Sequence, residues 1–184
     1  MREPLELLEP DMLRSLLSYD ERDGTLSWRK RGPALFAGSY PDRMAKTWNA
    51  RFANTKILSK TANGYIYLRA FGKFYLAHRV IWAMQSGEWP AFEIDHVDTD
   101  KTNNRLGNLR LASHPENARN RPAQSNNKGG IKGVYWDASR QSWQAHIAAN
   151  GKRHYLGRFK NVADAVDAYA KASASLHSTF GRNA

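Results

Sequence analysis

Residues 93–121 restrict the fold more than any other part of this chain, and they read EIDHVDTDKTNNRLGNLRLASHPENARNR. Apolar residues flank Asp95 and His96, a loop rich in Asp, Asn and Gly covers residues 98–107, and residues 108–112 return as a second strand. Ser113 followed by Glu116 is the capping-box pattern that starts a helix. The segment therefore predicts strand, loop, strand and helix. A unit this small buries little surface by itself, so it must pack on neighbouring elements.

The polar residues of this segment suit hydrolytic chemistry. Asp95 offers a hard carboxylate to a divalent cation, Asn117 on the predicted helix can add an amide oxygen, and phosphate oxygens and water would complete an octahedral Mg²⁺ shell. His96 can take a proton from an attacking water if a backbone carbonyl holds its other ring nitrogen. Asn108 is placed to bridge back across the loop and fix the hairpin that presents His96. Adjacent strand residues point to opposite faces, so Asp95 and His96 serve one site only where the strand ends or bulges.

The spacing of these four positions carries a family resemblance. Asp95-His96, Asn108 and Asn117, with NNRLGNLR and ENARNR around them, closely resemble the HNH nuclease motif, or ββα-metal fold, in the His-Asn-Asn variant of phage and intron homing endonucleases. The resemblance implies a DNA endonuclease with His96 as general base, Asp95 and Asn117 as metal ligands, and Asn108 as the structural middle residue of the catalytic site. It also implies one divalent cation per active site, Mg²⁺, Mn²⁺ or another, with the preference open because other members carry a second His in place of Asn117.

The region before the motif extends this resemblance to most of residues 11–121. SYDERDGTLSWRKR, GYIYLRAFGKFYLAHRVIWAM and GEWP are similar to segments that precede the motif in phage relatives, which implies a phage or prophage protein acting in the host cytoplasm. Hydrophobic spacing and turn residues predict a helix over 11–18, a strand over 25–31, a long irregular basic loop over 32–60, strands over 65–70 and 74–77, and a helix over 78–86.

A polar segment rich in Pro, Gly and Asn, residues 122–130, predicts a linker between two domains, 1–121 and 131–184. In the second domain, alternating apolar residues and the Asn150-Gly151 turn predict three antiparallel strands. An apolar stripe over 162–176 predicts a helix packed on that sheet. The fold class expected for the whole chain is α+β: a small β-rich region over 11–77, the ββα-metal core over 93–121, then the linker and the sheet with its helix.

The second domain resembles the plant ethylene-response-factor DNA-binding domain. The matching positions are Lys132-Gly133-Val134, Trp143, Leu156-Gly157, Phe159, Ala163, Ala165, Ala168 and Tyr169. By this resemblance the sheet lies in the DNA major groove, and the expected DNA-binding residues are Lys132, Tyr135, His146, Arg153 and Tyr155, with Arg140 and Gln144 nearby. Several arginines of the plant pattern are replaced here, by Tyr135, Asp137 and Ala148, so the base preference of that family does not carry over.

The charge pattern favours a polyanionic partner, double-stranded DNA. The chain of 184 residues has a formal net charge of +11 and no cysteine, which excludes a disulfide scaffold and a thiolate zinc site. Residues 25–60 carry eight basic side chains against one acidic, whereas residues 61–100 carry three against five. Arg29, Lys30 and Arg31 begin the basic stretch and either follow a DNA backbone or form a solvated face.

Three further residues are possible accessories of the site. His78, followed by Arg79, either touches a phosphate at the border of the site or closes the hairpin as a structural residue. His114, beside the capping Ser113, is expected to be exposed, with a role as an alternative metal ligand left open.

Other classes of function stay open at this point. A non-catalytic sequence-specific DNA-binding protein or transcription regulator would use the motif only as a scaffold, and an RNA-binding protein is less compatible with a sheet that enters a major groove. The chain is expected to be soluble and intracellular without a membrane partner. Its oligomeric state is open, with a monomer slightly favoured.

Overall fold

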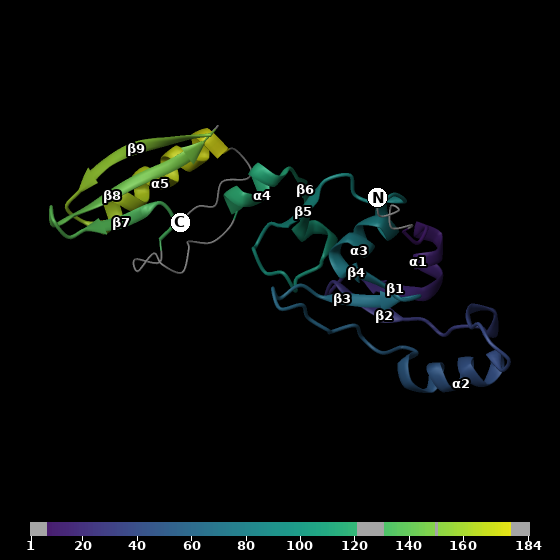
Figure 1. The fold of residues 1–184 in the computed structure, drawn as a ribbon. Helices are drawn as coiled ribbons and strands as arrows, with labels where there is room; N and C mark the ends of the chain where they lie inside the picture. Colours follow the sequence, from purple (N-terminus) through teal and green to yellow (C-terminus); the bar gives the residue numbers. More distant parts are fainter. Residues whose placement is uncertain (1–6, 121–130, 150, 178–184) are drawn as a thin grey trace, which may run out of the picture. The chain divides into compact units, whose positions relative to one another are not determined.

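The computed structural model describes residues 7–120, 131–149 and 151–177, and the chain divides into two compact units, residues 1–111 and 112–184 (Figure 1). Helices and separate small sheets make a mixed α+β fold, which confirms the predicted class. The predicted linker, residues 122–130, lies outside the described residues. Within the described ranges no helix is both long and apolar enough to span a membrane.

The first unit combines short helices with two-stranded sheets. In chain order its elements are α1 (Pro10–Leu16), β1 (Leu17–Asp20), β2 (Thr25–Trp28), the 3₁₀ helix η1 (Pro33–Leu35), α2 (Pro41–Phe52), β3 (Tyr67–Ala70), β4 (Lys73–Leu76), α3 (Ala77–Ser86), β5 (Glu93–His96), the 3₁₀ helix η2 (Leu106–Asn108) and β6 (Leu109–Ala112). Strands β1 and β2, β3 and β4, and β5 and β6 pair with each other. Leu13, Leu16 and Ile81 are fully buried in one core that joins α1, α3 and the strands.

Helix α1 ends before the predicted boundary. The sequence predicts helix through Ser18, but Leu17 already has extended backbone and pairs with Trp28 as the first residue of β1. The side chain of Leu17 is still fully buried, so this residue packs in the core as part of a strand and not of a helix. Periodicity alone cannot separate these cases over so few residues.

The prediction of an irregular loop over residues 32–60 is wrong, because α2 occupies its centre. The Gly and Pro residues that suggested a loop all precede or begin the helix, and Pro41 takes the first helical turn, where its missing N–H costs no hydrogen bond. The Trp48 ring packs edge-on against Trp28 at 5.7 Å between centroids and lies 5.3 Å from Phe52. Tertiary packing of these rings therefore stabilises a helix whose sequence is mainly polar.

The hairpin and helix before the motif follow the prediction closely. Phe71 and Gly72 turn β3 into β4 with φ of 49° and 74°, one residue earlier than the predicted turn. Helix α3 follows β4 directly and ends at Gly87, which has φ of 85° and donates its N–H to Ala83 O at 3.0 Å. This places α3 in the core of the first unit, which also contains Ile94 of β5 and Leu109 of β6.

The motif forms the predicted strand, loop, strand and helix. Helix α4 (His114–Asn120) follows β6 and belongs to the second unit. Glu116 accepts hydrogen bonds from the Ser113 backbone N–H at 2.8 Å and from the Ser113 hydroxyl at 2.6 Å. These contacts link the first turn of the helix to its capping residue, as the capping-box pattern predicts.

The rest of the second unit is a three-stranded antiparallel sheet with one helix. Strands β7 (Val134–Asp137), β8 (Ser142–Ala149) and β9 (Lys152–Phe159) pair in chain order, and α5 (Val162–His177) packs along one face (Figure 1). A shift of register after Ala145 marks a bulge against β9. Gly133 has φ of 73°, and a Cβ there would lie 2.2 Å from the Tyr169 ring, so only glycine permits this close approach. The predicted strands and helix are confirmed.

Candidate active site

Asp95 and His96 close strand β5 and are both buried, with exposed fractions of 5% and 4%. The strand ends at His96, and the chain turns immediately after it, with Thr99 N–H donating to His96 O at 2.9 Å. A strand end is the position at which adjacent side chains can serve one site.

The Asp95 carboxylate is paired with a cation supplied by β6. Arg110 donates to Asp95 Oδ2 from Nε at 2.9 Å and from Nη2 at 2.7 Å. The carboxylate side chain is 6% exposed and the arginine side chain 21% exposed. Two N–H groups of the guanidinium thus reach the Oδ2 atom, and Arg110 neutralises the charge of the buried carboxylate.

The side chain of Asn108 bridges the loop that joins β5 to β6. Its Nδ2 donates to Asp98 Oδ1 and to Asn103 O, both at 2.8 Å, while its Oδ1 accepts from Asp98 N–H at 3.1 Å. Burial alone would raise the pKa of Asp98, but hydrogen bonds from Asn103 and Asn108 outweigh it and hold that pKa below its ordinary value. Asp98 therefore stays ionised and fastens the loop from its first residue.

The ring of His96 is enclosed by polar and aromatic neighbours. Its Nε2 lies 3.0 Å from the Oδ1 of Asn104, which is 2% exposed. The His78 ring stands edge-on to it at 5.1 Å, and the Tyr65 ring lies 5.9 Å away. The sequence led us to expect a backbone carbonyl at the second nitrogen of His96, whereas the structure places a side-chain amide oxygen at Nε2.

His78 lies inside the core face of α3 and is 4% exposed. Burial, together with the nearby His96 and Arg79, lowers the pKa of His78 to about 3. Its Nδ1 is buried and has no hydrogen-bond partner among the described residues. A neutral, enclosed imidazole beside the His96 ring favours the structural role over contact with a phosphate.

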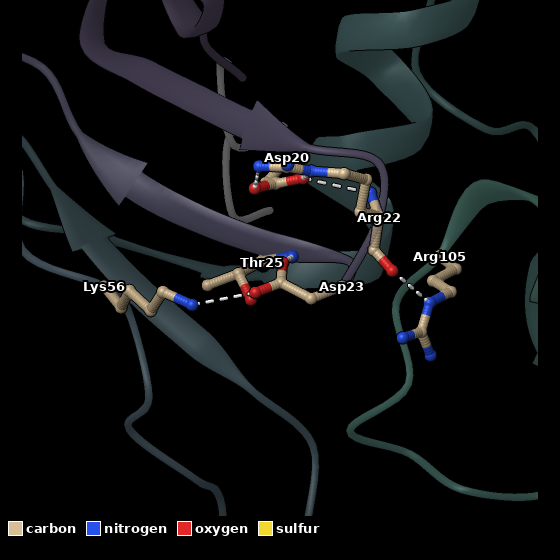
Figure 2. A network of polar contacts seen from close by, with 6 residues as sticks. All are labelled: Asp20, Arg22, Asp23, Thr25, Lys56 and Arg105. Atoms are coloured by element: carbon tan, nitrogen blue, oxygen red, sulfur yellow. Dashed lines mark hydrogen bonds and ion pairs between the residues drawn. The ribbon is translucent and has the colours of Figure 1, made fainter.

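The hairpin of β1 and β2, from a distant part of the sequence, contacts the site loop, which is the segment 97–108 that joins β5 to β6. Figure 2 shows Arg105 reaching the turn of that hairpin, where its Nε donates to Arg22 O at 2.6 Å. The same turn is tied by Arg22 to Asp20 and by Lys56 to Asp23, with ion-pair distances of 2.9 Å and 2.8 Å. The site loop is thus attached to a turn that has its own polar network.

The remaining candidates are Arg79 in α3 and two residues of α4. Arg79 donates to Phe92 O at 3.0 Å and to Pro90 O at 2.9 Å, so it anchors the chain that enters β5. Asn117 lies in α4 of the second unit, and its role as a ligand stays a prediction. His114 is exposed at the start of the same helix.

Several of the predicted DNA-binding residues of the second unit gather on one sheet face. The His146 ring lies 5.3 Å from the ring of Tyr135 and 5.1 Å from that of Tyr155, while Arg153 donates to the Tyr135 hydroxyl. Gln144 Nε2 donates to Asp137 Oδ2 at 2.6 Å, and Arg140 pairs with the same oxygen at 3.8 Å. Val134, Ala145 and Ile147 alternate with these side chains and are buried against α5. The face opposite the helix therefore carries aromatic and basic groups. Lys132 precedes β7 and is half-buried.

The three basic residues after β2 differ in their surroundings. Arg29 donates from Nε to Leu17 O at 2.7 Å. Arg31 is 8% exposed, and its guanidinium carbon lies 4.7 Å from the Trp28 ring and 4.0 Å from the Trp48 ring. Lys30 is exposed. Arg31 thus contributes to packing through cation–π contacts, contrary to a surface role in holding phosphates.

Comparison with known proteins identifies the class. A model of the HNH endonuclease family matches residues 75–119, which contain α3, β5, β6 and nearly all of α4. Protein 3.8 of Escherichia phage T7 is 32% identical over 118 residues, covering 62% of this chain and 97% of that protein. The HNH endonuclease L560 of Acanthamoeba polyphaga mimivirus is 31% identical over 120 residues, or 64% of this chain and 61% of that protein. The protein is an endonuclease. The chain belongs to the HNH endonuclease family.

A solved structure gives a weaker likeness. The HNH homing endonuclease I-HmuI superimposes with a TM-score of 0.38 at 16% identity, covering 92% of this chain and 90% of that chain. A score this low does not relate the two chains element by element.

Sequence reasoning missed three residues that shape the site: Asn104, Arg110 and Tyr65. Asn104 and Arg110 belong to the NNRLGNLR segment that carries the family resemblance, so their place in that segment indicated that they lie near the site. The side chains that they bind could not be predicted from the sequence. Tyr65 lies before β3 and reaches His78 and His96 only through the tertiary fold. No local pattern marks it.

Proposed function

We propose that this endonuclease hydrolyses the phosphodiester bonds of DNA with the help of a divalent metal ion. In this proposal His96 is the general base that takes a proton from the attacking water. The observation that carries it is the burial of His96 beside Asp95 at the end of β5, with one ring nitrogen held at 3.0 Å by Asn104. A base held through one nitrogen presents the other to its substrate in a defined direction.

The donor set suits a hard cation that takes most of its ligands from substrate and water. Asp95 supplies one buried carboxylate, and we propose that Asn117 supplies an amide oxygen. No cluster of three or more His, Cys, Asp or Glu side chains able to hold a metal occurs in the part of the chain that the structure describes. Mg²⁺ commonly binds through one or two carboxylates together with phosphate oxygens, so this sparse set fits it, and Mn²⁺ is compatible with the same donors. When bound, such an ion stabilises negative charge on the phosphate and on the leaving oxygen.

The other residues of the loop hold this pair in place. Asn108 fixes the hairpin through Asp98, so the direction of β5 relative to β6 is set next to the reacting groups. Arg110 neutralises Asp95 within the protein, and a metal ion would compete with it for the same carboxylate. We therefore infer that Arg110 is displaced or shared when the ion binds.

We further propose that the second unit binds DNA through the face of β7–β9 that is not covered by α5. The neighbouring rings of Tyr135, His146 and Tyr155 together with Arg153 provide the combination of aromatic groups and positive charge that nucleic acids bind. The likeness to ethylene-response-factor domains supports contact in the major groove. Lys30 of the first unit adds an exposed charge for the phosphate backbone.

The catalytic proposal is tested by cleavage of supercoiled plasmid with Mg²⁺ and with EDTA. We expect nicked or linear product only with the metal, and a His96→Ala variant that binds plasmid but cleaves it at least about 100-fold more slowly. His154→Ala is the matched control because His154 is exposed on β9 of the other unit. Cleavage by His96→Ala at the wild-type rate would refute the base assignment. Binding without cleavage in the wild type would favour a DNA-binding regulator.

The binding proposal is tested with two variants that each remove one positive charge. Arg153→Ala should weaken binding of a DNA duplex roughly ten-fold, because its guanidinium lies over the Tyr135 ring on the proposed DNA-binding face. Lys171→Ala should leave binding nearly unchanged, since Lys171 is 76% exposed on α5 and pairs with Asp167. Equal losses in the two variants would mean that only net charge matters, and stronger binding to an RNA duplex would contradict a major-groove role.

A further inference from the structure

We propose that Asn104 is the positioning residue that sets the tautomer of His96, and that the β1–β2 hairpin holds Asn104 in place. Asn104 accepts a hydrogen bond from Nε2–H of His96, so the lone pair that can accept a proton is on Nδ1. The inference rests on the proposed function, in which His96 is the general base, and it names the groups that prepare that base.

The contact between the two side chains is short and enclosed. His96 Nε2 and Asn104 Oδ1 are 3.0 Å apart, and the two residues are 4% and 2% exposed. An amide oxygen only accepts hydrogen bonds, and a neutral imidazole has a single N–H. The contact therefore requires the N–H on Nε2. The alternative tautomer would set two lone pairs against each other in this buried contact, at a cost comparable to that of an unmade buried hydrogen bond.

The rings around His96 restrict its rotation. His78 lies edge-on at 5.1 Å between ring centroids, and Tyr65 lies 5.9 Å away on a separate segment. A half-turn of the His96 ring would exchange Nδ1 for a carbon and withdraw Nε2 from Asn104. The ring is thus held by packing together with the directional contact to Asn104.

Asn104 itself is held by the first hairpin of the chain. The Tyr19 hydroxyl of β1 donates to Asn104 O at 3.1 Å and accepts the N–H of Leu106 at 2.9 Å. Arg105 donates to Arg22 O at 2.6 Å in the β1–β2 turn (Figure 2). These bonds hold the backbone from Asn104 to Leu106, so the amide of Asn104 enters the site from a fixed position.

Gly24 lets the β1–β2 turn approach the backbone of Asn104 and Arg105 closely. It has φ of +75°, and a Cβ there would lie 2.6 Å from the carbonyl carbon of Asn104 and 2.5 Å from the nitrogen of Arg105. The turn and the site loop therefore touch backbone to backbone. Gly72 has nearly the same φ, +74°, but its Cβ would meet nothing within 4 Å. The two glycines share the same local strain and differ only in whether a side chain would push on Asn104.

The tautomer can be measured directly by nitrogen-15 NMR of the histidine rings, in a buffer alkaline enough to leave imidazoles neutral. We expect the wild-type His96 ring to carry its proton on Nε2. A wild-type ring protonated on Nδ1 would overturn the inference without the need for any variant. Asn104→Leu keeps a similar volume without an acceptor, and we expect mixed tautomers and a plasmid-cleavage kcat lower by about 10- to 100-fold with an unchanged KM for DNA.

Asn104→Asp keeps an acceptor oxygen and should retain the Nε2–H tautomer and most of kcat. A leucine variant with the wild-type tautomer and kcat, or an aspartate variant as impaired as the leucine one, would contradict the positioning role.

The role of the hairpin is tested by Gly24→Ala against Gly72→Ala. Both variants should lose similar stability from the positive φ, but only Gly24→Ala should alter the His96 ring signals and lower kcat. Equal effects in the two variants would remove the hairpin from the inference. If His96→Ala cleaved plasmid normally, the proposed function would fail, while the NMR result would still decide whether Asn104 sets the tautomer.

Discussion

Acidification should destabilise the first unit through His78, because this residue is buried in a neutral form. Burial, with His96 and Arg79 nearby, lowers its pKa to about 3, whereas an unfolded histidine has a pKa of about 6.5. Between these two values the unfolded chain binds a proton that the folded chain does not. The contribution of His78 to the free energy of unfolding is therefore complete above about pH 6.5 and decreases as the pH falls toward about 3.

The size of this effect follows from the same values. At about pH 5 the unfolded histidine is almost fully protonated and the folded one is not, so the loss relative to about pH 8 is near 1.5 times 1.36 kcal/mol, or about 2 kcal/mol. His78→Phe keeps a ring in the same space and cannot titrate. The variant should also be as stable as the wild type or more stable by about 1 kcal/mol at the higher pH, because it removes the buried Nδ1 that lacks a described partner.

Urea unfolding of the full chain at the two pH values, followed by tryptophan fluorescence, measures the difference. The quantity of interest is the pH-dependent loss in the wild type minus that in His78→Phe, because the other titrating groups cancel in this difference. We expect about 2 kcal/mol. His154→Phe, at an exposed position of the second unit, should show no such difference. Equal losses in the wild type and His78→Phe would refute the reasoning, as would an imidazole signal of His78 that titrates near pH 6.5.

Three other predictions concern the packing, the site and the binding of DNA. Gly133→Ala should destabilise the second unit by about 2–4 kcal/mol, because of its positive φ and the overlap of the new Cβ with the Tyr169 ring. Gly151→Ala has the same φ of 73° but open space around it, so it should cost about 1 kcal/mol. Thermal unfolding measures both costs, and equal values would contradict the close approach at Gly133. Arg110→Met should lower the free energy of unfolding by about 2 kcal/mol without metal, because Asp95 loses its counter-charge. Added Mg²⁺ should then raise the melting temperature of the variant more than that of the wild type. An equal rise would show that the ion does not compete with Arg110 for this carboxylate. Because the chain has a net charge of +11, binding to a DNA duplex should weaken steeply between about 50 and 200 mM salt, and a flat salt dependence in a mobility-shift titration would argue against phosphate contacts.

The elements were predictable where one local signal defined them. Helix α3 has an uninterrupted apolar pattern and a glycine stop, and β8 and β9 have alternating residues around an Asn-Gly turn. Helix α2 was not predictable, because its stability depends on Trp48 packing against Trp28, a residue from another element. Arg31 illustrates the same limit: its sequence context is that of a surface cation, and only the aromatic rings brought around it by folding make it a buried one.

The sequence alone predicts the order of strand, loop, strand and helix, and its family resemblance indicates the class of nuclease and the candidate site residues Asp95, His96 and Asn108. The order of the elements follows from residue types at short, regular spacings, which local backbone geometry turns into fixed directions. The environment of those groups depends on the tertiary fold, which pairs Asp95 with Arg110 and brings Asn104 to His96. The contact of Asn104 with His96 depends on Tyr19 and Gly24, far away in the chain, because contacts between distant segments form only when burial of the shared core brings their backbones together.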